Sequence, residues 1–349
     1  MRRYTISDIA RMADVSPATV SRVLSNSPGV NKVKRAEVKR IIEETGYHPS
    51  SAARSLVRGC SNVVGLIVRD LENQYYSAMA VCAQRRLLER GYMTMIFSIG
   101  TKAEAEEKRD YVTEISHKFD FAGLLISVPS CDYFAAEGIR NSRCPVVSLN
   151  RTFDVACDQV AQNDFQAGFL AGEYLQKLGH ESFLLLAGPA DESVSCRFRM
   201  EGFIQALAVN GRELDEENAI RGELSMDSGY ELGVKLLEER FPDHLPTGIF
   251  ANGNSIALGF LKACGERGVR IPQDVSLITV DNPAIMDMPG INLSTISVPM
   301  EQMASEAVDV LLERIERKRE KKRFVALQPE LIVRGSTAPP QRRCLPDNK

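Results

Sequence analysis

The sequence predicts a small all-α head followed by an α/β core of two doubly wound parallel-sheet lobes. With 349 residues, the chain has room for two or three domains, each large enough to enclose its own core. The amino-terminal segment shows apolar residues at helical spacing, whereas from Val63 onward short apolar runs alternate with longer amphipathic segments. This alternation of strand and helix is typical of parallel sheets covered by helices on both faces.

The head begins with two short helices separated by a break at Asp14. In the first, apolar residues recur three and four positions apart, so they form one face of a helix. The second starts with Ser16, a favourable N-cap residue, and Pro17, which suits the first helical position. The residues expected to face inward from the two helices are Ile6, Ile9, Ala10, Ala13, Val20, Val23 and Leu24.

A third helix is predicted over residues 32–45, with Asn31 as its cap and Gly46 at its end. Three helices of this size can enclose a minimal core. The inward-facing residues of the third helix are Val38, Ile41 and Ile42.

Two short helices joined by three or four residues match the helix-turn-helix unit, whose second helix lies in the major groove of DNA. The alternative is an ordinary helical hairpin, which can show the same spacing. The exposed side of the second helix carries no acid, and the guanidinium of Arg22 can bind a guanine edge through two hydrogen bonds. The residues expected on that side are Pro17, Ala18, Thr19, Ser21 and Arg22.

The charge of the chain is unevenly distributed. Residues 1–59 hold 11 Lys and Arg against 5 Asp and Glu, a net charge of +6, and the remainder carries −9. Attraction to phosphate should therefore be local to the head. Residues 47–62 are polar and small and predict a linker, within which residues 50–56 have helix propensity but are too few to be helical alone. We expect them to fold only against a partner.

The core alternates buried strands with amphipathic helices. The predicted strands, read as buried on both faces, are 63–68, 94–97, 123–127, 146–149, 183–188, 248–251 and 275–280. The predicted helices are 75–90, 104–117, 165–178, 198–209, 228–240 and 254–267. Seven or more such units exceed one comfortable sheet, which predicts two lobes with a cleft between them. Parallel sheets bind ligands at the carboxyl ends of their strands.

Polar and aromatic residues follow several of these strands. Adjacent rings at Tyr75 and Tyr76 can stack on a flat apolar face, such as that of a sugar or a nucleobase. Amide and charged groups near such rings suit a small polyhydroxy ligand. Taken singly, each could instead be a loop cap or a surface pair. The strand-end residues are Asn73, Tyr75, Tyr76, Asn150, Arg151, Arg197, Arg199, Asn252, Asp281 and Asn282.

Several function classes are disfavoured. The eight cysteines are scattered without metal-ligand spacing, which favours reduced cytosolic thiols over zinc or disulfides. The start of the chain lacks the pattern of a signal peptide, and no apolar run of about 18 residues predicts a membrane span. No phosphate-binding loop, dinucleotide fingerprint or hydrolase motif is present, so we expect a cytoplasmic protein that is not an enzyme and uses no cofactor or metal.

A basic run at residues 313–324 offers two interpretations. It could be a second nucleic-acid-binding segment. The preferred interpretation is the solvated end of a helix whose Val310, Leu311 and Ile315 pack inward.

Motifs along the whole chain resemble the lactose-repressor (LacI/GalR) family of bacterial transcription regulators. In order, they are TISDIARMADVSPATVSRVL, GYHPSSAARSL, GLIV followed by NQYY, RMEGF, FANGNSIALG, VSLITVDN and STISVP. The resemblance implies a periplasmic-binding-protein-like core behind a helix-turn-helix head. It also implies these boundaries: a DNA-binding domain at 1–46, a hinge helix or linker at 47–61 and an effector-binding and dimerisation core at 62–349. Within the core, the N-lobe would hold about 62–162 plus 293–324, and the C-lobe about 163–292 plus 325–340.

The resemblance assigns DNA contacts to the head and the hinge. In the family, the hinge folds into a short helix on DNA, and Leu56 occupies the position that wedges into the minor groove and kinks the duplex. Pro17, Ala18 and Arg22 would read base edges. The other DNA-binding residues implied are Thr5, Ser16, Thr19, Ser21, Asn26, Tyr47 and Ala53.

The resemblance also assigns an effector site between the lobes. The residues implied are Asn73, Tyr75, Tyr76, Arg151, Arg199, Leu224, Asn252 and Asp281. The chain departs from the usual pattern at the turn, where Asp14 replaces the common Gly but tolerates a left-handed backbone. It departs again at Leu224, Gly253 and Val298, where many sugar-binding members carry an aromatic, an Asp and a Gln. These departures imply a cleft with fewer polar contacts.

The expected function is that of a sequence-specific transcriptional regulator, first of all a repressor. It would bind a near-palindromic double-stranded operator as a homodimer, or as a tetramer, under the control of a small metabolite such as a sugar or its phosphate. Closure of the cleft would move the paired hinges apart and melt residues 50–57. Corepression, a nucleobase effector and a partner protein are alternatives within the class. Outside the class, a solute-binding receptor would need an export signal and no basic head.

Overall fold

A computed structural model describes residues 4–24, 27–47, 61–99, 113–127, 138–149, 157–188, 193–241, 245–297 and 299–341. Of the expected site residues, Asn26, Ala53, Leu56 and Arg151 lie outside these ranges, as does Val298. The chain divides into two compact units, Met1–Asn62 and Val63–Lys349. Among the described residues, no helix combines the length and the apolar character needed to cross a membrane.

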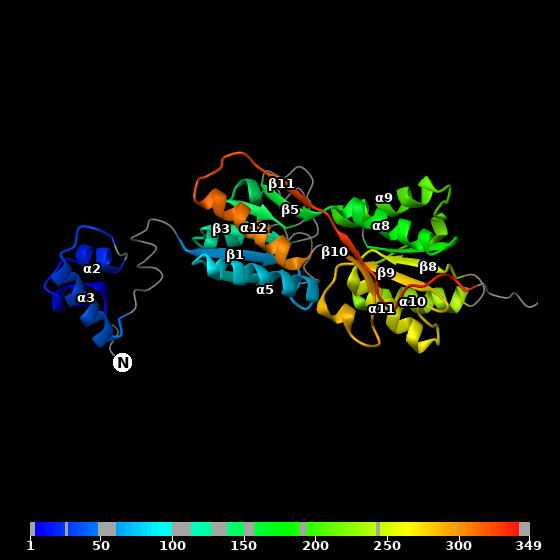
Figure 1. Ribbon diagram of the computed structural model, residues 1–349, viewed down its shortest axis with the longest axis horizontal. Helices are drawn as coiled ribbons and strands as arrows, with labels where there is room; N and C mark the ends of the chain where they lie inside the picture. Colours follow the sequence, from blue (N-terminus) through cyan, green and yellow to red (C-terminus); the bar gives the residue numbers. More distant parts are fainter. Residues whose placement is uncertain are drawn as a thin grey trace, which may run out of the picture. The chain divides into compact units, whose positions relative to one another are not determined.

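The described part of the first unit, residues 4–24 and 27–47, forms three helices with well-defined ends (Figure 1). Thr5 and Asp8 form a reciprocal capping box at the start of α1, and the Ser16 hydroxyl accepts a hydrogen bond from the Thr19 N–H at the start of α2. Gly46 ends α3 with a left-handed backbone, φ +59°. The helices are α1 (Ile6–Met12), α2 (Pro17–Leu24) and α3 (Lys32–Thr45).

The core of the first unit follows the expected apolar faces, with one correction. Ile9, Val20 and Val38 are fully buried, but Leu24, which was expected inside, is 37% exposed. Tyr47 takes part in the core instead, with only 6% of its surface exposed. A ring at this position buries more apolar surface than the last side chain of a two-turn helix can. Asp14 adopts the left-handed backbone that the turn requires, at φ +48°.

The second unit contains two six-stranded sheets, which confirms the two-lobed α/β fold. The first sheet has the order β11-β5-β4-β3-β1-β2, and all neighbouring strands in it are parallel. Helices α5 (Gln74–Glu89) and α12 (Met300–Ile315) pack on one face of it. Helical segments at 113–118 and 138–140 contribute Ile115 and Ile139 to the cluster on the other face. Its strands are β1 (Val63–Val68), β2 (Met93–Ser98), β3 (Gly123–Ser127), β4 (Val146–Ser148), β5 (Asp158–Gln162) and β11 (Phe324–Leu327).

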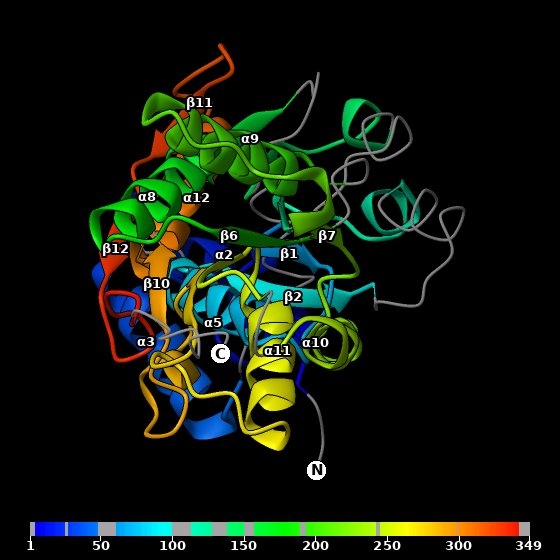
Figure 2. The same cartoon turned by 90° about the vertical axis from the view of Figure 1, so that its right-hand side faces the viewer.

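The second sheet has the order β12-β10-β9-β8-β6-β7 and is parallel except where β12 meets β10. Helices α8 and α9 cover one face of it, and α10 and α11 cover the other (Figure 2). Its strands are β6 (Phe183–Ala187), β7 (Ala219–Arg221), β8 (Gly248–Ala251), β9 (Ser276–Val280), β10 (Ser294–Ser297) and β12 (Glu330–Ile332). Its helices are α8 (Asp164–Lys177), α9 (Val194–Val209), α10 (Met226–Arg240) and α11 (Asn254–Glu266), with short 3₁₀ turns η1 (Glu216–Asn218) and η2 (Ala284–Asp287).

The chain crosses between the lobes three times, and two crossings differ from the expected boundaries. Residues 293–324 were expected in the N-lobe, but β10 pairs with β9 in the second sheet. Residues 325–340 were expected in the C-lobe, but β11 pairs with β5 in the first sheet. These strands are short, and β10 is rich in Ser and Thr, whose buried hydroxyls are hydrogen-bonded, as those of Ser294 and Thr337 are to each other at 2.8 Å.

The strand at 94–97, expected to be buried on both faces, is an exception. It is part of β2, the last strand of the first sheet, and Met93 and Met95 are exposed there. An edge strand has a neighbour on one side only, so part of its surface stays open to solvent.

Glycines allow two helix pairs to come into backbone contact. A Cβ atom at Gly168 of α8 would lie 1.8 Å from the carbonyl oxygen of Arg199 in α9, and one at Gly202 would lie 2.0 Å from that of Phe165. Helices α10 and α11 approach in the same way at Gly229 and Gly259. These contacts fix the position of α9, and therefore of Arg199, against the sheet.

The basic run after α12 is built into the first lobe rather than simply solvated. The Arg319 guanidinium donates to the carboxylate of the buried Asp158 at 2.7 Å, and Arg314 pairs with the same carboxylate at 3.4 Å. Arg319 also pairs with Glu313 at 3.0 Å. These contacts neutralise a buried charge at the first residue of β5 and hold the turn that leads into β11.

Candidate functional site

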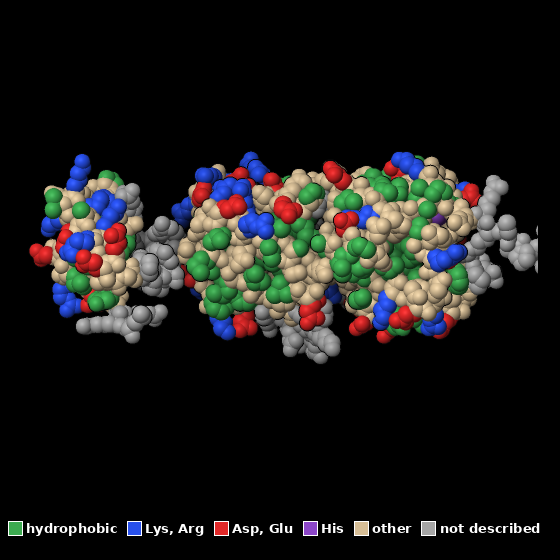
Figure 3. All heavy atoms as spheres, turned by 60° about the horizontal axis from the view of Figure 1, so that its bottom comes forward, with side chains coloured by type: hydrophobic (Ala, Val, Ile, Leu, Met, Phe, Trp, Pro, Cys, Tyr) green, Lys and Arg blue, Asp and Glu red, His purple; other side chains and the backbone are tan. Residues whose placement is uncertain are grey.

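The outer side of α2 presents the residues expected to read DNA. Pro17, Ala18 and Arg22 are exposed, and Thr19 and Ser21 are half-buried. Lys and Arg side chains are visible over the surface of this unit in Figure 3. A helix that leaves one guanidinium and several small polar groups uncovered is the kind of surface that reads groove edges.

Thr5, Ser16 and Tyr47, which were also expected to contact DNA, stabilise the helices or the core of the first unit. The hydroxyls of Thr5 and Ser16 accept hydrogen bonds from N–H groups in the first turns of α1 and α2. Phosphate oxygens could approach the same helix starts, where N–H groups point outward. Tyr47 is not on this surface, because its ring lies in the core of the unit and burial raises the pKa of its hydroxyl.

A cavity of about 70 Å³ lies between the two lobes of the core. Its walls come from the ends of strands and the starts of helices in both sheets, as expected for a doubly wound fold. The lining residues are Arg69, Asp70, Asn73, Tyr75, Tyr76, Ser193, Ser195, Cys196, Arg199, Leu224, Gly253, Asn254, Ser255 and Asp281.

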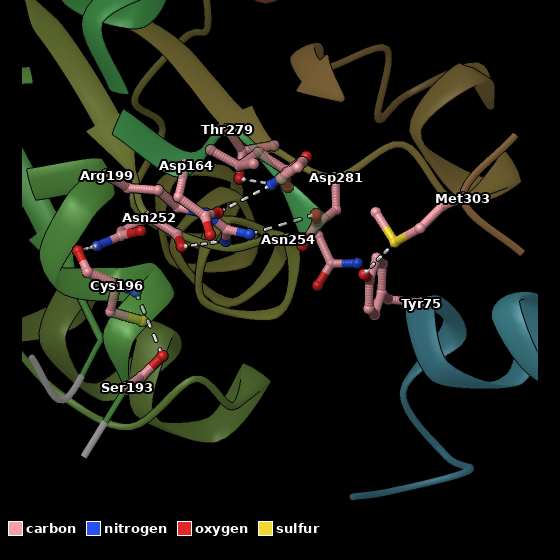
Figure 4. Close-up of polar contacts among 12 residues, drawn as sticks. Tyr75, Asp164, Ser193, Cys196, Arg199, Asn252, Asn254, Thr279, Asp281 and Met303 are labelled. Atoms are coloured by element: carbon pink, nitrogen blue, oxygen red, sulfur yellow. Dashed lines mark hydrogen bonds and ion pairs between the residues drawn. The ribbon is translucent and has the colours of Figure 1, made fainter. Parts of the chain in front are cut away.

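Arg199 is the centre of a buried polar cluster (Figure 4). Its Nε donates to Asp164 Oδ1 at 2.7 Å, and its Nη1 donates to the carbonyl oxygen of Asn252 at 3.2 Å. Its Nη2 lies 3.7 Å from Asp281 Oδ1. Asp281 itself has a left-handed backbone, φ +70°, directly after β9. Such an unfavourable conformation in a non-glycine residue is most frequent at functional sites.

The two carboxylates outweigh the one guanidinium in this cluster. Burial by itself lowers the pKa of Arg199, but the charges of Asp164 and Asp281 raise that pKa above its ordinary value. Burial raises the pKa of the Asp281 carboxyl, Arg199 lowers it and Asp164 adds to the rise, so that the net pKa is higher than usual. The site therefore holds both hydrogen-bond donors and strong acceptors at fixed positions.

Asn252 supports the cluster from behind. It is fully buried, and its Nδ2 donates to the carbonyl oxygen of Cys196 at 2.9 Å. Its Oδ1 has no hydrogen-bond partner among the described residues. A buried acceptor without a donor is unfavourable. The Asn252 Oδ1 is such an acceptor among the described residues.

Two tyrosines at the start of α5 form the opposite wall. Their rings lie 5.2 Å apart and are nearly perpendicular, and the Tyr75 hydroxyl donates to Met303 Sδ at 3.6 Å (Figure 4). Burial raises the pKa of both hydroxyls, so both remain protonated near neutral pH. The wall therefore combines aromatic surface with polar edges.

One hydrogen bond joins the lobes directly across the cleft. Asn73 Nδ2, at the start of α5, donates to the Ser255 hydroxyl of α11 at 3.1 Å. Asn73 also caps its own helix, since its Oδ1 accepts from the Tyr75 N–H. We call this hydrogen bond the Asn73–Ser255 latch. It connects two helix starts that belong to different lobes.

The structure brings together most of the effector residues expected from the sequence. Asn73, Tyr75, Tyr76, Arg199, Leu224 and Asp281 line one cavity, whereas Asn252 lies behind it. Sequence reasoning missed Asp164, which holds Arg199, and several lining residues. Arg69 and Asp70 directly follow the first strand, so the strand-end rule would have found them. The missed lining residues are Arg69, Asp70, Ser193, Ser195, Cys196, Asn254 and Ser255.

Comparison with known proteins places the chain in a family. The protein-family model described as "Bacterial regulatory proteins, lacI family" matches residues 5–50. The family model described as "Periplasmic binding protein-like domain" matches residues 173–337. The transcriptional repressor PurR of Klebsiella pneumoniae is 30% identical over 337 residues, which cover 96% of this chain and 97% of that protein. The chain belongs to the lacI family.

Solved structures of lacI-family proteins share the fold. A lac repressor dimer bound to operator and the anti-inducer ONPF has a TM-score of 0.84 and 25% identity, covering 97% of this chain and 100% of that one. A lacI-family regulator of Enterococcus faecalis with bound ribose has a TM-score of 0.69 and 26% identity, covering 80% and 100%. This lacI-family chain is accordingly a DNA-binding transcriptional regulator, and the named relatives are regulators rather than enzymes.

Proposed function

We propose that this lacI-family chain is a cytoplasmic repressor that binds a near-palindromic operator as a homodimer and releases it when a small polyhydroxy metabolite, a carbohydrate or its derivative, occupies the cleft. The observation that carries the proposal is the Arg199 cluster. It presents donors and acceptors opposite two aromatic rings, which suits hydroxyl groups on a compact ring. The bound ribose of the Enterococcus faecalis relative supports the same ligand class.

The DNA-binding part of the proposal predicts a base-specific role for Arg22. Because this side chain is exposed on α2, Arg22→Ala should remove about 1–3 kcal/mol of discrimination at one base pair of each half-site. Competition binding with operators mutated one base pair at a time measures this loss. Lys39→Ala, an exposed cation on α3, is the control and should leave base preference unchanged. Equal weakening on all sequences by Arg22→Ala would contradict a base contact.

The exposed apolar surface of the first lobe supports the homodimer. Val81 and Leu88, seven residues apart on α5, are 52% and 69% exposed, and Met93 and Met95 of β2 are also exposed. Figure 3, which brings the α5 side of the core forward, shows hydrophobic side chains on that side. A surface of this kind is typical of a protein interface. A twofold dimer then accounts for a palindromic operator.

Two experiments on the full-length protein test the proposed function. In vitro selection from random duplexes should return a palindromic site. A thermal-shift screen of neutral sugars, sugar derivatives and nucleobases should find a compound that raises the melting temperature, because a ligand of the native state stabilises it. That compound should then weaken operator binding. Recovery of a chemically converted compound, or selection of no sequence, would overturn the proposal.

If the cleft closes on the effector, the Asn73–Ser255 latch should contribute to effector affinity. If the effector holds the lobes together, Ser255→Ala should weaken its binding about 2- to 10-fold, since the closed form loses one hydrogen bond. Calorimetric titration with the compound from the screen measures the change. Ser116→Ala is the control, because the Ser116 hydroxyl donates to the Thr113 carbonyl oxygen of its own helical segment at 2.9 Å and does not line the cavity. Unchanged affinity in Ser255→Ala would show that the latch does not contribute to the bound state.

A further inference from the structure

The two arginines that face the cavity are in different electrostatic states. Arg199 is held by two carboxylates and a carbonyl oxygen, so its charge is neutralised within the protein. Arg69 lies directly after β1 and lines the same cavity. Its backbone N–H donates to the Ser127 carbonyl oxygen, but within the described part of the chain its guanidinium has no hydrogen bond and no ion pair. Among the residues that the structure describes, this half-buried guanidinium in the cleft therefore has no counter-ion.

The two acidic residues that line the cavity together with Arg69 do not supply that counter-ion. Asp70, its neighbour in sequence, accepts a hydrogen bond from the Glu72 N–H, so that its carboxylate is bound to the backbone of its own loop. Asp281 is paired with Arg199. The charge of Arg69 does reach the neighbouring Tyr76, whose pKa it lowers although burial raises it more. The guanidinium is thus close to the aromatic wall and is not neutralised there.

Other groups around the cavity also offer donors. Helix α11 begins at the cavity without a side-chain cap, so the N–H groups of its first turn are available. The Ser195 hydroxyl lines the cavity and makes no hydrogen bond within the described residues. Hydroxyl groups of a neutral sugar can accept some of these hydrogen bonds, but they cannot balance the charge of a guanidinium. Only an anionic oxygen group does both, and a guanidinium binds carboxylate and phosphate oxygens in pairs.

We propose that the effector carries an anionic oxygen group, a phosphate ester or a carboxylate, which Arg69 binds while the hydroxyl groups of the same molecule face Arg199 and Asp281. This inference rests on the proposed function and narrows its ligand class. The anionic end would lie beside Arg69, at the carboxyl end of β1. Arg69 therefore separates anionic from neutral ligands, and the Arg199 cluster recognises both.

Thermal-shift titrations of the full-length protein test this proposal with defined probes. Inorganic phosphate and acetate are titrated against sodium chloride at matched ionic strength, so that general salt effects are removed. Glucose and ribose are then compared with glucose 6-phosphate, glucuronate and ribose 5-phosphate. We expect a saturable rise in melting temperature with phosphate or with acetate. If phosphate gives the rise, the two sugar phosphates should stabilise the protein more than the neutral sugars do. If acetate gives it, glucuronate should do so.

The variants are Arg69→Gln, Arg69→Lys and the control Arg212→Gln, which removes an exposed side chain that pairs with the exposed Glu181. Arg69→Gln should weaken binding of the anionic probe about 10- to 100-fold, Arg69→Lys should weaken it less, and Arg212→Gln should match the parent. Arg69→Gln should still fold, because within the described residues it breaks no hydrogen bond or ion pair of the side chain.

The outcomes separate this inference from the proposed function. If anions give no rise beyond that of sodium chloride, or if Arg69→Gln responds as the parent does, the anionic subsite is refuted, while a neutral sugar that stabilises the protein keeps the proposed function. If Arg69→Gln weakens neutral and anionic sugars equally, Arg69 is a general contact and the inference is again refuted. If no sugar of either kind stabilises the protein or alters operator binding, the proposed function itself is lost.

Discussion

Arg199→Met is expected to remove about 3–5 kcal/mol from the free energy of unfolding at neutral pH. The variant leaves Asp164 and Asp281 buried on the same side of the cleft without the cation that neutralises them. The loss should exceed that of any exposed pair, because both carboxylates are buried. Urea denaturation of the full-length protein, followed by circular dichroism, measures it. The effector response should disappear at the same time.

The pH dependence of Arg199→Met provides the mechanism check. Burial already raises the pKa of Asp281 in the folded state, and loss of Arg199 raises it further. A carboxyl whose folded pKa is higher than its unfolded pKa binds its proton more tightly when folded, so its unfavourable contribution shrinks as the pH falls through the folded pKa. The deficit of the variant should therefore be smaller at pH 5 than at pH 7.5.

The control for this prediction is Arg212→Met. Arg212 and Glu181 form an ion pair at 2.7 Å in the same lobe, but both side chains are exposed. Exposed pairs contribute about 0–1 kcal/mol, so this variant should unfold almost as the parent does. A deficit in Arg199→Met no larger than that of the control would refute the view that the guanidinium neutralises a buried charge.

Gly168→Ala is the second change with a large expected effect. The added Cβ atom would lie 1.8 Å from the carbonyl oxygen of Arg199, which is backbone and cannot move aside. Helices α8 and α9 would have to separate, at a cost of about 3 kcal/mol, the upper part of the usual range for overpacking. Because the separation shifts α9 at Arg199 itself, the effector affinity should fall as well. Thermal unfolding and calorimetric titration measure the two effects.

Gly265→Ala is the matched control for this change. Gly265 lies in α11, and a Cβ atom there would meet nothing within 4 Å. Replacing glycine by alanine inside a helix favours the helix by about 0.5–1 kcal/mol, so this variant should be slightly stabilised. If both variants behaved alike, the close approach of α8 and α9 would not be a determinant of stability.

The sequence allowed the prediction of elements whose signals are local. Ser16 and Pro17 mark the start of α2 because capping depends on a few adjacent residues. Strands such as β6 and β8 are continuous apolar runs, since both of their faces are covered. Tyr75, Arg199 and Asp281 could be grouped in advance because parallel strands end at a common edge.

Elements that depend on distant partners could not be predicted in this way. Strand β5, with Asp158 and two glutamines, has a polar sequence, and its first carboxylate is tolerated because Arg319, 161 positions away, and Arg314 pair with it. Asp164 follows that unpredicted strand, so its contact with Arg199 was missed as well. Ser255 acts through a hydrogen bond to a residue 182 positions away, and no periodicity encodes such a contact.

The interleaving of the two lobes has a consequence for synthesis on the ribosome. The first sheet lacks β11, and one face of it lacks α12, until the chain has been translated to Leu327. Until then, β5 presents an unpaired edge and the α12 side of the sheet exposes apolar residues, both of which promote aggregation. The second lobe, whose four helices and most of whose strands are contiguous from Asp164 to Ser297, can assemble earlier. Truncated nascent chains should therefore need chaperones until the chain has emerged as far as Leu327, which lies in the last tenth of the sequence.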